Sequence, residues 1–320
     1  MITQRTVAAG SVELRITEAG EGPVVLLLHG FPEGAHSWRH QLEPLANAGY
    51  HVVAPDQRGY GASSHPHQVD AYTIMHLTGD LVALLAGLGA TSCVVVGHDW
   101  GAPVAWNLAM ARPDLVRGVL GMSVPPMPRG PMPRLQAVRQ ATGGRFYTNY
   151  IERAGVADAE LAKDVRTSLR RIFHGLSGAG SGGQRRSLLV PEGGELLDAF
   201  GEHDVMPSWL SPADLDVFAA QFEDEGFTAS LNWYRNLDRN WELTSVFEGF
   251  RLPMPAWFVA GELDTVLGFP GTREVVATLT ERHDRFRPPL LLPGCGHWLQ
   301  QERPAETTEA ILDFVSAVDR

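Results

Sequence analysis

The sequence predicts an α/β protein, in which a mostly parallel sheet is crossed by helices and interrupted by a helical insertion. Short apolar runs alternate with longer amphipathic stretches in both end regions of the chain, a pattern typical of strands joined by crossover helices. This alternation stops near residue 125 and resumes near residue 248. The chain has 320 residues, of which 44% are hydrophobic and 20% charged, and this composition fits a globular protein with a substantial core.

The predicted strands and helices follow one another along the chain. Residues 6–8 and 12–16 flank Ala9-Gly10 and predict an N-terminal hairpin at the sheet edge. Apolar runs predict six further strands at 24–28, 52–54, 93–96, 116–120, 256–260 and 290–292. Amphipathic stretches predict helices at 38–48, 74–88, 102–111, 272–280 and 305–318. Gly49 and Gly89 stand where helices should end, and Pro304 stands where the last helix should begin.

The interval 125–247 lacks this strand–helix rhythm. It opens with PPMPRGPMP, continues through an Arg-rich helical stretch, and contains GLSGAGSGG at 175–183, which predicts a flexible loop. The two halves of a sheet must rejoin for either half to be stable. We therefore expect residues 1–124 and 248–320 to form one core, and residues 125–247 to form a helical cap inserted into it.

Charge and composition exclude several classes of partner. The formal net charge is −11 and the cationic residues are scattered, so nucleic acid is not an expected partner. The longest apolar runs are too short to span a bilayer, and we expect a cytoplasmic protein without an integral membrane segment. The two cysteines, Cys93 and Cys295, have no metal-site spacing, so no metal or other cofactor is expected. A homodimer is compatible with the sequence, although no stretch argues for one.

The stretch CVVVGHDWGAPVAW, residues 93–106, carries the first chemical motif. Gly97 and Gly101 bracket Asp99 between an apolar strand and a helix, which is the context of a nucleophile elbow. Small residues at the two glycine positions allow the sharp turn that exposes the central side chain. No serine in the chain has glycine both two residues before it and two residues after it, so a serine elbow is absent. Asp99 is the candidate nucleophile, and His98 is expected to brace the turn.

An acid and a histidine should follow such a nucleophile, each just after a strand. Asp264 follows the expected strand at 256–260, and His297 follows the strand at 290–292. Glu262 is a rival for the acid, and we favour Asp264 on its position in the loop.

The reactivity of a carboxylate indicates the reaction class. A serine attacking a saturated carbon would form an ether, which an activated water cannot readily hydrolyse. A carboxylate forms an ester instead, and water activated by His297 can attack the carbonyl carbon of that ester. With a reference pKa of about 3.9, aspartate is ionised without a base, which leaves the histidine free for the second step. The triad thus indicates displacement at a saturated carbon.

The oxyanion of ester hydrolysis and the leaving group both need donors. The backbone N–H groups of Trp100 and of Phe31, in the segment HGFP, are the candidates for the oxyanion. An epoxide oxygen additionally needs an acidic hydrogen, which a neutral tyrosine can supply. The interval 125–247 contains three of the six tyrosines: Tyr147, Tyr150 and Tyr234.

Five segments together resemble the epoxide hydrolases of the α/β-hydrolase superfamily. They are HGFPEGAHSWRHQ, APDQRGYGASS, VGHDWGAPVAW, SLNWYRNLDRNW and GCGHWLQQERP, and the likeness covers nearly the whole chain. The resemblance implies an eight-stranded, mostly parallel sheet flanked by helices, with a helical cap.

The same resemblance assigns roles to individual residues. It implies that Asp99 is the nucleophile, that Asp264 and His297 activate water, and that Tyr147 and Tyr234 polarise the epoxide oxygen. Tyr150 stays an alternative to Tyr147. The oxyanion hole and substrate pocket would be built from His29, Phe31, Pro32 and Trp100. The expected partner is a small apolar epoxide, hydrated to a vicinal diol.

Three other hypotheses about the function compete with an epoxide hydrolase. A haloalkane dehalogenase shares the Asp-His-Asp triad, but Phe31, Tyr147 and Tyr234 disfavour it. A fluoroacetate dehalogenase would have an arginine soon after the nucleophile, where Trp100 and Gly101 stand. A ligand-binding protein that keeps the fold without catalysis would be expected to lack a triad member, and all members are present.

Overall fold

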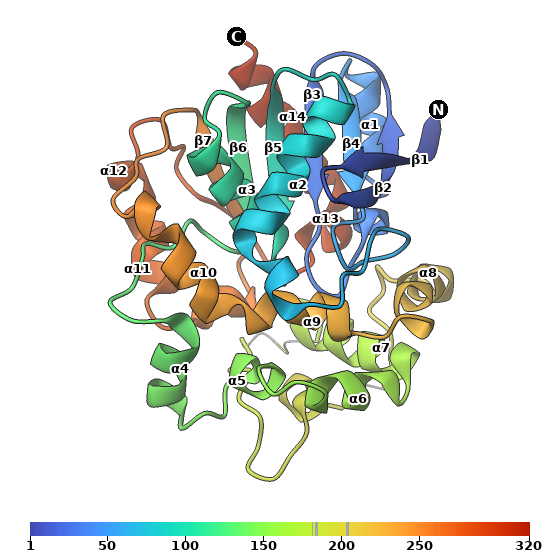
Figure 1. Cartoon of the computed structure of the whole chain (residues 1–320), viewed down its shortest axis with the longest axis vertical. Coiled ribbons are helices and arrows are strands. Elements are labelled where there is room, and N and C mark those ends of the chain that lie inside the picture. The colour runs from blue at the N-terminus through green and yellow to red at the C-terminus, as the bar shows by residue number, and fades with distance from the viewer. Residues whose placement is uncertain (181, 183–184, 203–204) are drawn as a thin grey trace.

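The computed structural model describes the whole chain except residues 181, 183, 184, 203 and 204. Its described strands form one eight-stranded sheet in the order β1-β2-β4-β3-β5-β6-β7-β8 (Figure 1). The strands are β1 (Ile2–Ala9), β2 (Val12–Ala19), β3 (Val24–Leu28), β4 (His51–Pro55), β5 (Cys93–His98), β6 (Val116–Met122), β7 (Ala256–Gly261) and β8 (Leu290–Leu292). The pairs β1–β2 and β2–β4 are antiparallel, and the other neighbouring pairs are parallel. The expected mostly parallel sheet with an N-terminal hairpin is confirmed.

The central strands are buried on both faces, because helices cover the sheet from either side. All five residues of β3, the run VVLLL, are buried. Val25 and Leu27 belong to the apolar core on one face, and Leu26 and Leu28 belong to the core on the other. The sheet therefore divides two hydrophobic layers, as a continuous apolar run in a parallel strand predicts.

Four helices supply most of the covering layers beside the sheet. Helices α1 (Leu42–Asn47) and α14 (Pro304–Val318) pack on the face of Val25, and α2 (Ile74–Gly87) and α3 (Gly101–Ala111) pack on the opposite face. Helix α2 begins after Thr73, whose side chain accepts a hydrogen bond from the N–H of His76. The expected boundaries at Gly89 and Pro304 are confirmed, since Gly89 follows the C-cap with φ +68° and Pro304 is the first residue of α14.

Two expected helices are shorter than predicted. The stretch 38–48 contains a 3₁₀ turn at Ala35–Trp38 and then α1, rather than one helix. Pro44 explains the break, because a proline inside a longer helix would lack the N–H for the ladder and clash with the preceding turn. The stretch 272–280 is divided into α11 (Thr272–Ala277) and α12 (Leu279–Arg282).

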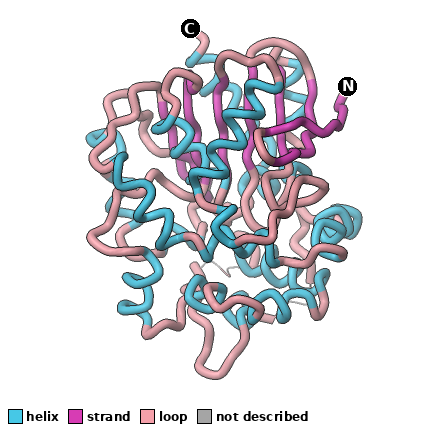
Figure 2. The backbone as a smooth tube through the Cα atoms, in the orientation of Figure 1, coloured by secondary structure: helices cyan, strands magenta, loops and turns pink. Residues whose placement is uncertain are grey.

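The chain between β6 and β7 is helical in its described part. Its helices are α4 (Arg134–Thr142), α5 (Tyr147–Ile151), α6 (Val156–Ala162), α7 (Val165–Leu176), α8 (Pro212–Glu223), α9 (Thr228–Arg235) and α10 (Leu237–Leu243). Figure 2 shows the sheet in the upper half of the molecule and these helices and loops across its lower end. We call residues 125–247 the helical insertion.

The glycine-rich segment 175–183 was expected to be a loop throughout. Helix α7 extends into it as far as Leu176, and residues 177–180 are bends and turns. Residues 181 and 183 lie outside the described part of the chain. Among the described residues, no helix has both the length and the apolar character needed to cross a membrane.

Candidate active site

Asp99 stands on a tight turn between β5 and α3. Its φ of 48° lies in the left-handed region, which costs a residue other than glycine about 1–3 kcal/mol and persists only where the surroundings enforce it. The two flanking glycines are required by close packing. A Cβ at Gly97 would overlap the carbonyl of Gly101, and a Cβ at Gly101 would overlap the carbonyl of Leu28. The turn therefore directs the carboxylate of Asp99 away from the sheet.

His297 lies between two carboxylates from different parts of the chain. Its Nδ1 is 3.0 Å from Oδ1 and 3.2 Å from Oδ2 of Asp264, and its Nε2 is 3.5 Å from Oδ2 of Asp99. Asp264 follows β7 and is fully buried, whereas Glu262 is exposed and accepts a hydrogen bond from the N–H of Gly294. The structure thus places Asp264, and not Glu262, against the histidine.

The charges in this cluster shift the pKa values of His297 and Asp99. Burial alone would lower the pKa of His297, but the charge and hydrogen bonding of Asp264, followed by those of Asp99, raise it well above its ordinary value. Burial alone would raise the pKa of Asp99, but hydrogen bonding to His297 and the positive charge of that ring lower it. Asp99 is therefore an ionised carboxylate at neutral pH, beside a histidine that holds its proton firmly.

The segment HGFP brings one backbone donor to Asp99. The N–H of Phe31 donates to Oδ1 of Asp99 at 2.8 Å. Gly30 allows this approach, because a Cβ there would overlap the side chain of Asp99. Phe31 lines the cavity at the site, but His29 and Pro32, which were expected to do so, are not among the lining residues.

His29 points into the core instead. Its Nδ1 donates to the carbonyl of Gly30 at 2.9 Å, and its Nε2 accepts from the N–H of Gln57 at 2.9 Å. Burial lowers the pKa of His29 to about 4. The ring is therefore neutral, and it joins the backbone of Gly30 to that of Gln57.

The structure separates the three candidate tyrosines. Tyr147 begins α5 and Tyr234 lies on α9, and both line the cavity that contains Asp99 and His297. Their ring centroids are 5.9 Å apart in an edge-on arrangement. Burial, followed by the charge of Asp99, raises the pKa of both hydroxyls above the ordinary value, so both keep their protons. Tyr150 is not among the lining residues, and the guanidinium of Arg153 lies over its ring at 4.4 Å.

The rest of the cavity wall is almost entirely apolar. Trp100, which was also expected to line the pocket, is buried and is not among the lining residues; its ring centroid lies 5.1 Å from that of Tyr234. The remaining lining residues could not be identified from the sequence, because an apolar side chain on a helix has the same pattern whether it faces a core or a cavity. They are Ile151, Ile172, Leu176, Leu188, Leu196, Phe200, Thr265, Val266 and Phe269.

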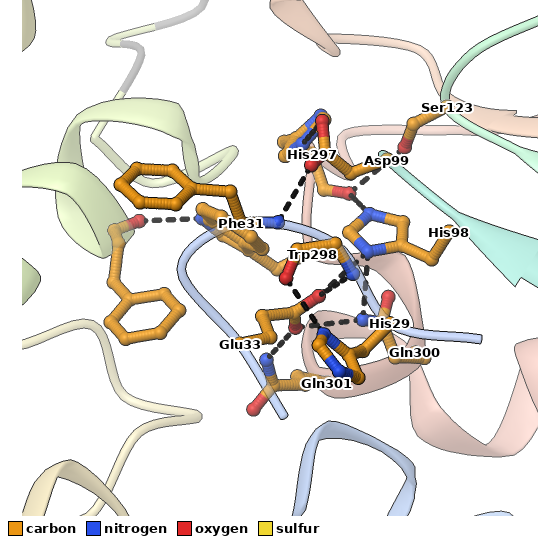
Figure 3. A network of polar contacts seen from close by, with 12 residues as sticks. His29, Phe31, Glu33, His98, Asp99, Ser123, His297, Trp298, Gln300 and Gln301 are labelled. Atoms are coloured by element: carbon orange, nitrogen blue, oxygen red, sulfur yellow. Dashed lines mark hydrogen bonds and ion pairs between the residues drawn. The ribbon is translucent and has the colours of Figure 1, made fainter. Parts of the chain in front are cut away.

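A fully buried carboxylate, Glu33, organises the polar groups behind the site (Figure 3). It accepts from Nε2 of Gln300 at 2.9 Å and from Nε2 of Gln301 at 2.7 Å, and its Oε2 lies 2.9 Å from Nδ1 of His98. Nε2 of His98 donates to the carbonyl of His297 at 2.8 Å. His98, the last residue of β5, therefore braces the loop of His297. Glu33 was not singled out from the sequence, because its partners lie far along the chain.

Within the described part of the chain, no three His, Cys, Asp or Glu side chains are gathered as a metal ion would require.

Comparisons with known proteins agree on one family. A model of the alpha/beta hydrolase fold matches residues 23–304. The chain is 45% identical to Epoxide hydrolase A of Mycobacterium tuberculosis, covering 99% of this chain and 98% of that protein. It is 36% identical to Epoxide hydrolase 2 of Siraitia grosvenorii, covering 98% of each.

Solved structures give the same result. The structure of Epoxide Hydrolase A from Mycobacterium thermoresistibile matches with a TM-score of 0.92 and 46% identity, covering 99% of this chain and 98% of that one. An epoxide hydrolase from an endophytic Streptomyces matches with a TM-score of 0.94 and 38% identity, covering 99% of this chain and 96% of that one.

Proposed function

The chain belongs to the epoxide hydrolases of the α/β-hydrolase fold, and from this premise we propose that it hydrates an apolar epoxide through a covalent ester on Asp99. One observation carries the proposal: Asp99, His297, Tyr147 and Tyr234 line a single, otherwise apolar cavity. A nucleophile, a base and two proton donors are the groups that opening an epoxide and hydrolysing the resulting ester require.

In the first step, the carboxylate of Asp99 attacks a ring carbon and the bond from that carbon to the ring oxygen breaks. The hydrogen bond from the N–H of Phe31 orients the carboxylate of Asp99. The lowered pKa of Asp99 keeps this carboxylate ionised. The ring oxygen takes a proton from Tyr147 or Tyr234 as it leaves. The raised pKa of both hydroxyls prevents an early loss of that proton.

Ester formation also changes His297. The charge of Asp99 is one of the causes that raise the pKa of His297, and the ester carries no charge. The pKa of the histidine therefore falls, and its proton can pass to the tyrosinate left by the first step. His297 becomes a neutral base only once there is an ester to hydrolyse.

In the second step, water attacks the carbonyl carbon of the Asp99 ester and gives a proton to His297. Asp264 stabilises the imidazolium that forms, through its contacts with Nδ1 at 3.0 and 3.2 Å. The N–H of Phe31 lies where the oxyanion develops, and we assign the N–H of Trp100 as the second donor. The bond from the carbonyl carbon to the substrate oxygen breaks, and that oxygen takes the proton of the carboxylic acid formed on Asp99. The diol leaves, and all side chains return to their starting protonation.

We further propose that residues 125–247 act as a cap that holds substrate over the nucleophile. Support comes from the lining, to which α5, α7 and α9 of the helical insertion contribute. The apolar wall supports an uncharged, largely apolar substrate. The two free, buried cysteines, Cys93 and Cys295, support the cytoplasm as the working compartment.

Haloalkane dehalogenation is the rival reaction, because it uses the same triad. The test incubates purified enzyme with styrene oxide and, separately, with 1-bromobutane, with Asp99→Ala as the control. We expect wild type to release the diol and no bromide, and the variant to release neither. Bromide release without diol formation would show that the tyrosines do not serve as acids and would favour the dehalogenase.

A further inference from the structure

The carboxylate of Glu302 binds backbone N–H groups from two separate segments. Glu302 is the last residue of α13 (Leu299–Glu302), five positions after His297. Its Oε2 accepts from the N–H of Gly178 at 2.8 Å and from the N–H of Gly296 at 3.1 Å. Its Oε1 accepts from the N–H of Trp298 at 3.1 Å. Gly296 and Trp298 flank His297, whereas Gly178 belongs to the helical insertion, just beyond α7.

Other contacts join the same two segments. The N–H of His297 donates to the carbonyl of Leu176, the last residue of α7, at 2.9 Å. Nε1 of Trp298 donates to the carbonyl of Phe173 at 2.9 Å. The two backbones are packed against each other, because a Cβ at Gly296 would overlap the N–H of Gly178. The three consecutive N–H groups around the catalytic histidine are thus all bonded to Glu302 or to α7.

In the described part of the chain, the side chain of Glu302 accepts hydrogen bonds from both segments: from Gly178 beyond α7, and from Gly296 and Trp298 beside His297. Burial raises the pKa of Glu302, and the hydrogen bonds from the N–H groups of Gly178, Gly296 and Trp298 act in the opposite direction. Three partly buried donors lose their acceptor together if this side chain is removed. Glu302 therefore supplies three of the hydrogen bonds that order the histidine loop and the end of α7.

We propose that Glu302 is a positioning residue that fixes the His297 loop to the end of α7, so that the base is aligned only while the helical insertion is docked. Ile172 and Leu176 of α7 line the cavity, so a bound substrate touches the same helix that holds the base. The inference rests on the proposed two-step reaction. Asp99 is held by the elbow and by the N–H of Phe31, which Glu302 does not contact, so ester formation should not need the clamp.

The test measures the two steps separately in Glu302→Ala and Glu302→Gln. Single-turnover reactions with styrene oxide, quenched for intact-protein mass spectrometry, give the rates of ester formation and ester decay. We expect decay in Glu302→Ala to slow about ten- to hundredfold, while formation stays within about threefold of wild type. Glu302→Gln keeps one accepting oxygen, so its rate of ester decay should lie between those of wild type and Glu302→Ala.

The matched control is Glu262→Gln. Glu262 also accepts from the backbone of this loop, from the N–H of Gly294 at 3.1 Å, but it is exposed. Both of its rates should equal those of wild type. Equal slowing of formation and decay in Glu302→Ala, or an unchanged decay rate, would overturn the proposal.

A second measurement does not depend on the ester. Hydrogen–deuterium exchange of the resting Glu302→Ala protein should accelerate in peptides covering residues 176–178 and 296–298 together, while the elbow at Asp99 stays protected. Acceleration over the whole chain, or over one of these segments alone, would contradict a clamp. If wild type forms no ester, the proposed reaction fails, and the exchange result still decides whether Glu302 joins the two segments.

Discussion

At the scale of single residues, the site works through groups whose ionisation depends on one another. His297 faces Asp264 on one side of its ring and Asp99 on the other. In the proposed reaction Asp99 loses its charge when it forms an ester, so the first step would prepare the base for the second. Tyr147 and Tyr234 are the proposed donors for the first step, and they lie in a wall where the other side chains are mostly apolar.

The tyrosines should act as acids in ester formation. Tyr147→Phe and Tyr234→Phe, which each lack one acid, should form the ester about tenfold or more slowly, and the double variant about 10²- to 10⁴-fold more slowly. Ester decay should not change in the single variants, because the remaining tyrosine can still take the proton of His297. Single-turnover mass spectrometry measures both rates, and Tyr150→Phe is the matched control because Tyr150 lies outside the cavity lining. A Tyr150→Phe enzyme slower than Tyr147→Phe would reverse the assignment.

At the scale of elements, the positions of Asp99, Asp264 and His297 are determined by the ends of the strands that precede them. Asp99 follows β5, Asp264 follows β7 and His297 follows β8, so parallel strands bring three distant parts of the chain to one edge of the sheet. The elbow depends on helix α3 lying close against the end of β3, and glycine is what permits that distance.

Gly101→Ala should therefore be destabilising. The added methyl group would overlap the carbonyl oxygens of Leu28 and His29, which are backbone atoms and cannot move aside cheaply. We expect a loss of about 3 kcal/mol in the free energy of unfolding, measured by urea denaturation.

The control for that substitution is Gly79→Ala in the middle of α2. A Cβ at Gly79 meets nothing within 4 Å, so this variant should gain about 0.5–1 kcal/mol through helix propensity. If the two variants had equal stability, close packing at the elbow would not be what selects glycine there.

At the scale of the whole molecule, stability should depend on pH through His29. This ring is neutral in the fold, with its pKa lowered from 6.5 to about 4, so unfolding takes up a proton at mildly acidic pH. Its stabilising contribution is complete above about pH 6.5 and is lost as the pH falls through about 4, which corresponds to about 3 kcal/mol.

The measurement compares the free energy of unfolding of wild type and His29→Asn between pH 7 and pH 4. The wild-type value should fall by up to about 3 kcal/mol more than that of the variant over this range. Parallel curves would mean that His29 titrates alike in the folded and unfolded states.

The sequence predicted the sheet and the positions of Asp99, Asp264 and His297 at strand ends, because each of those features is local. Apolar runs mark strands, and Asp99, Asp264 and His297 are marked by the strands before them. Glu33 and Glu302 were not found, since their partners become neighbours only in the fold. Pro44 shortened an expected helix, and His29, expected at the cavity, lies in the core.

Trapping the proposed ester on Asp99 would test the two-step reaction. His297→Ala is incubated with styrene oxide, its intact mass is measured, and the modified residue is located by peptide mapping, with Asp99→Ala treated in parallel. We predict one added substrate mass on Asp99 in the first variant, none in the second, and diol from wild type. Diol from wild type with no adduct in His297→Ala, or with an adduct on another residue, would contradict the two-step reaction.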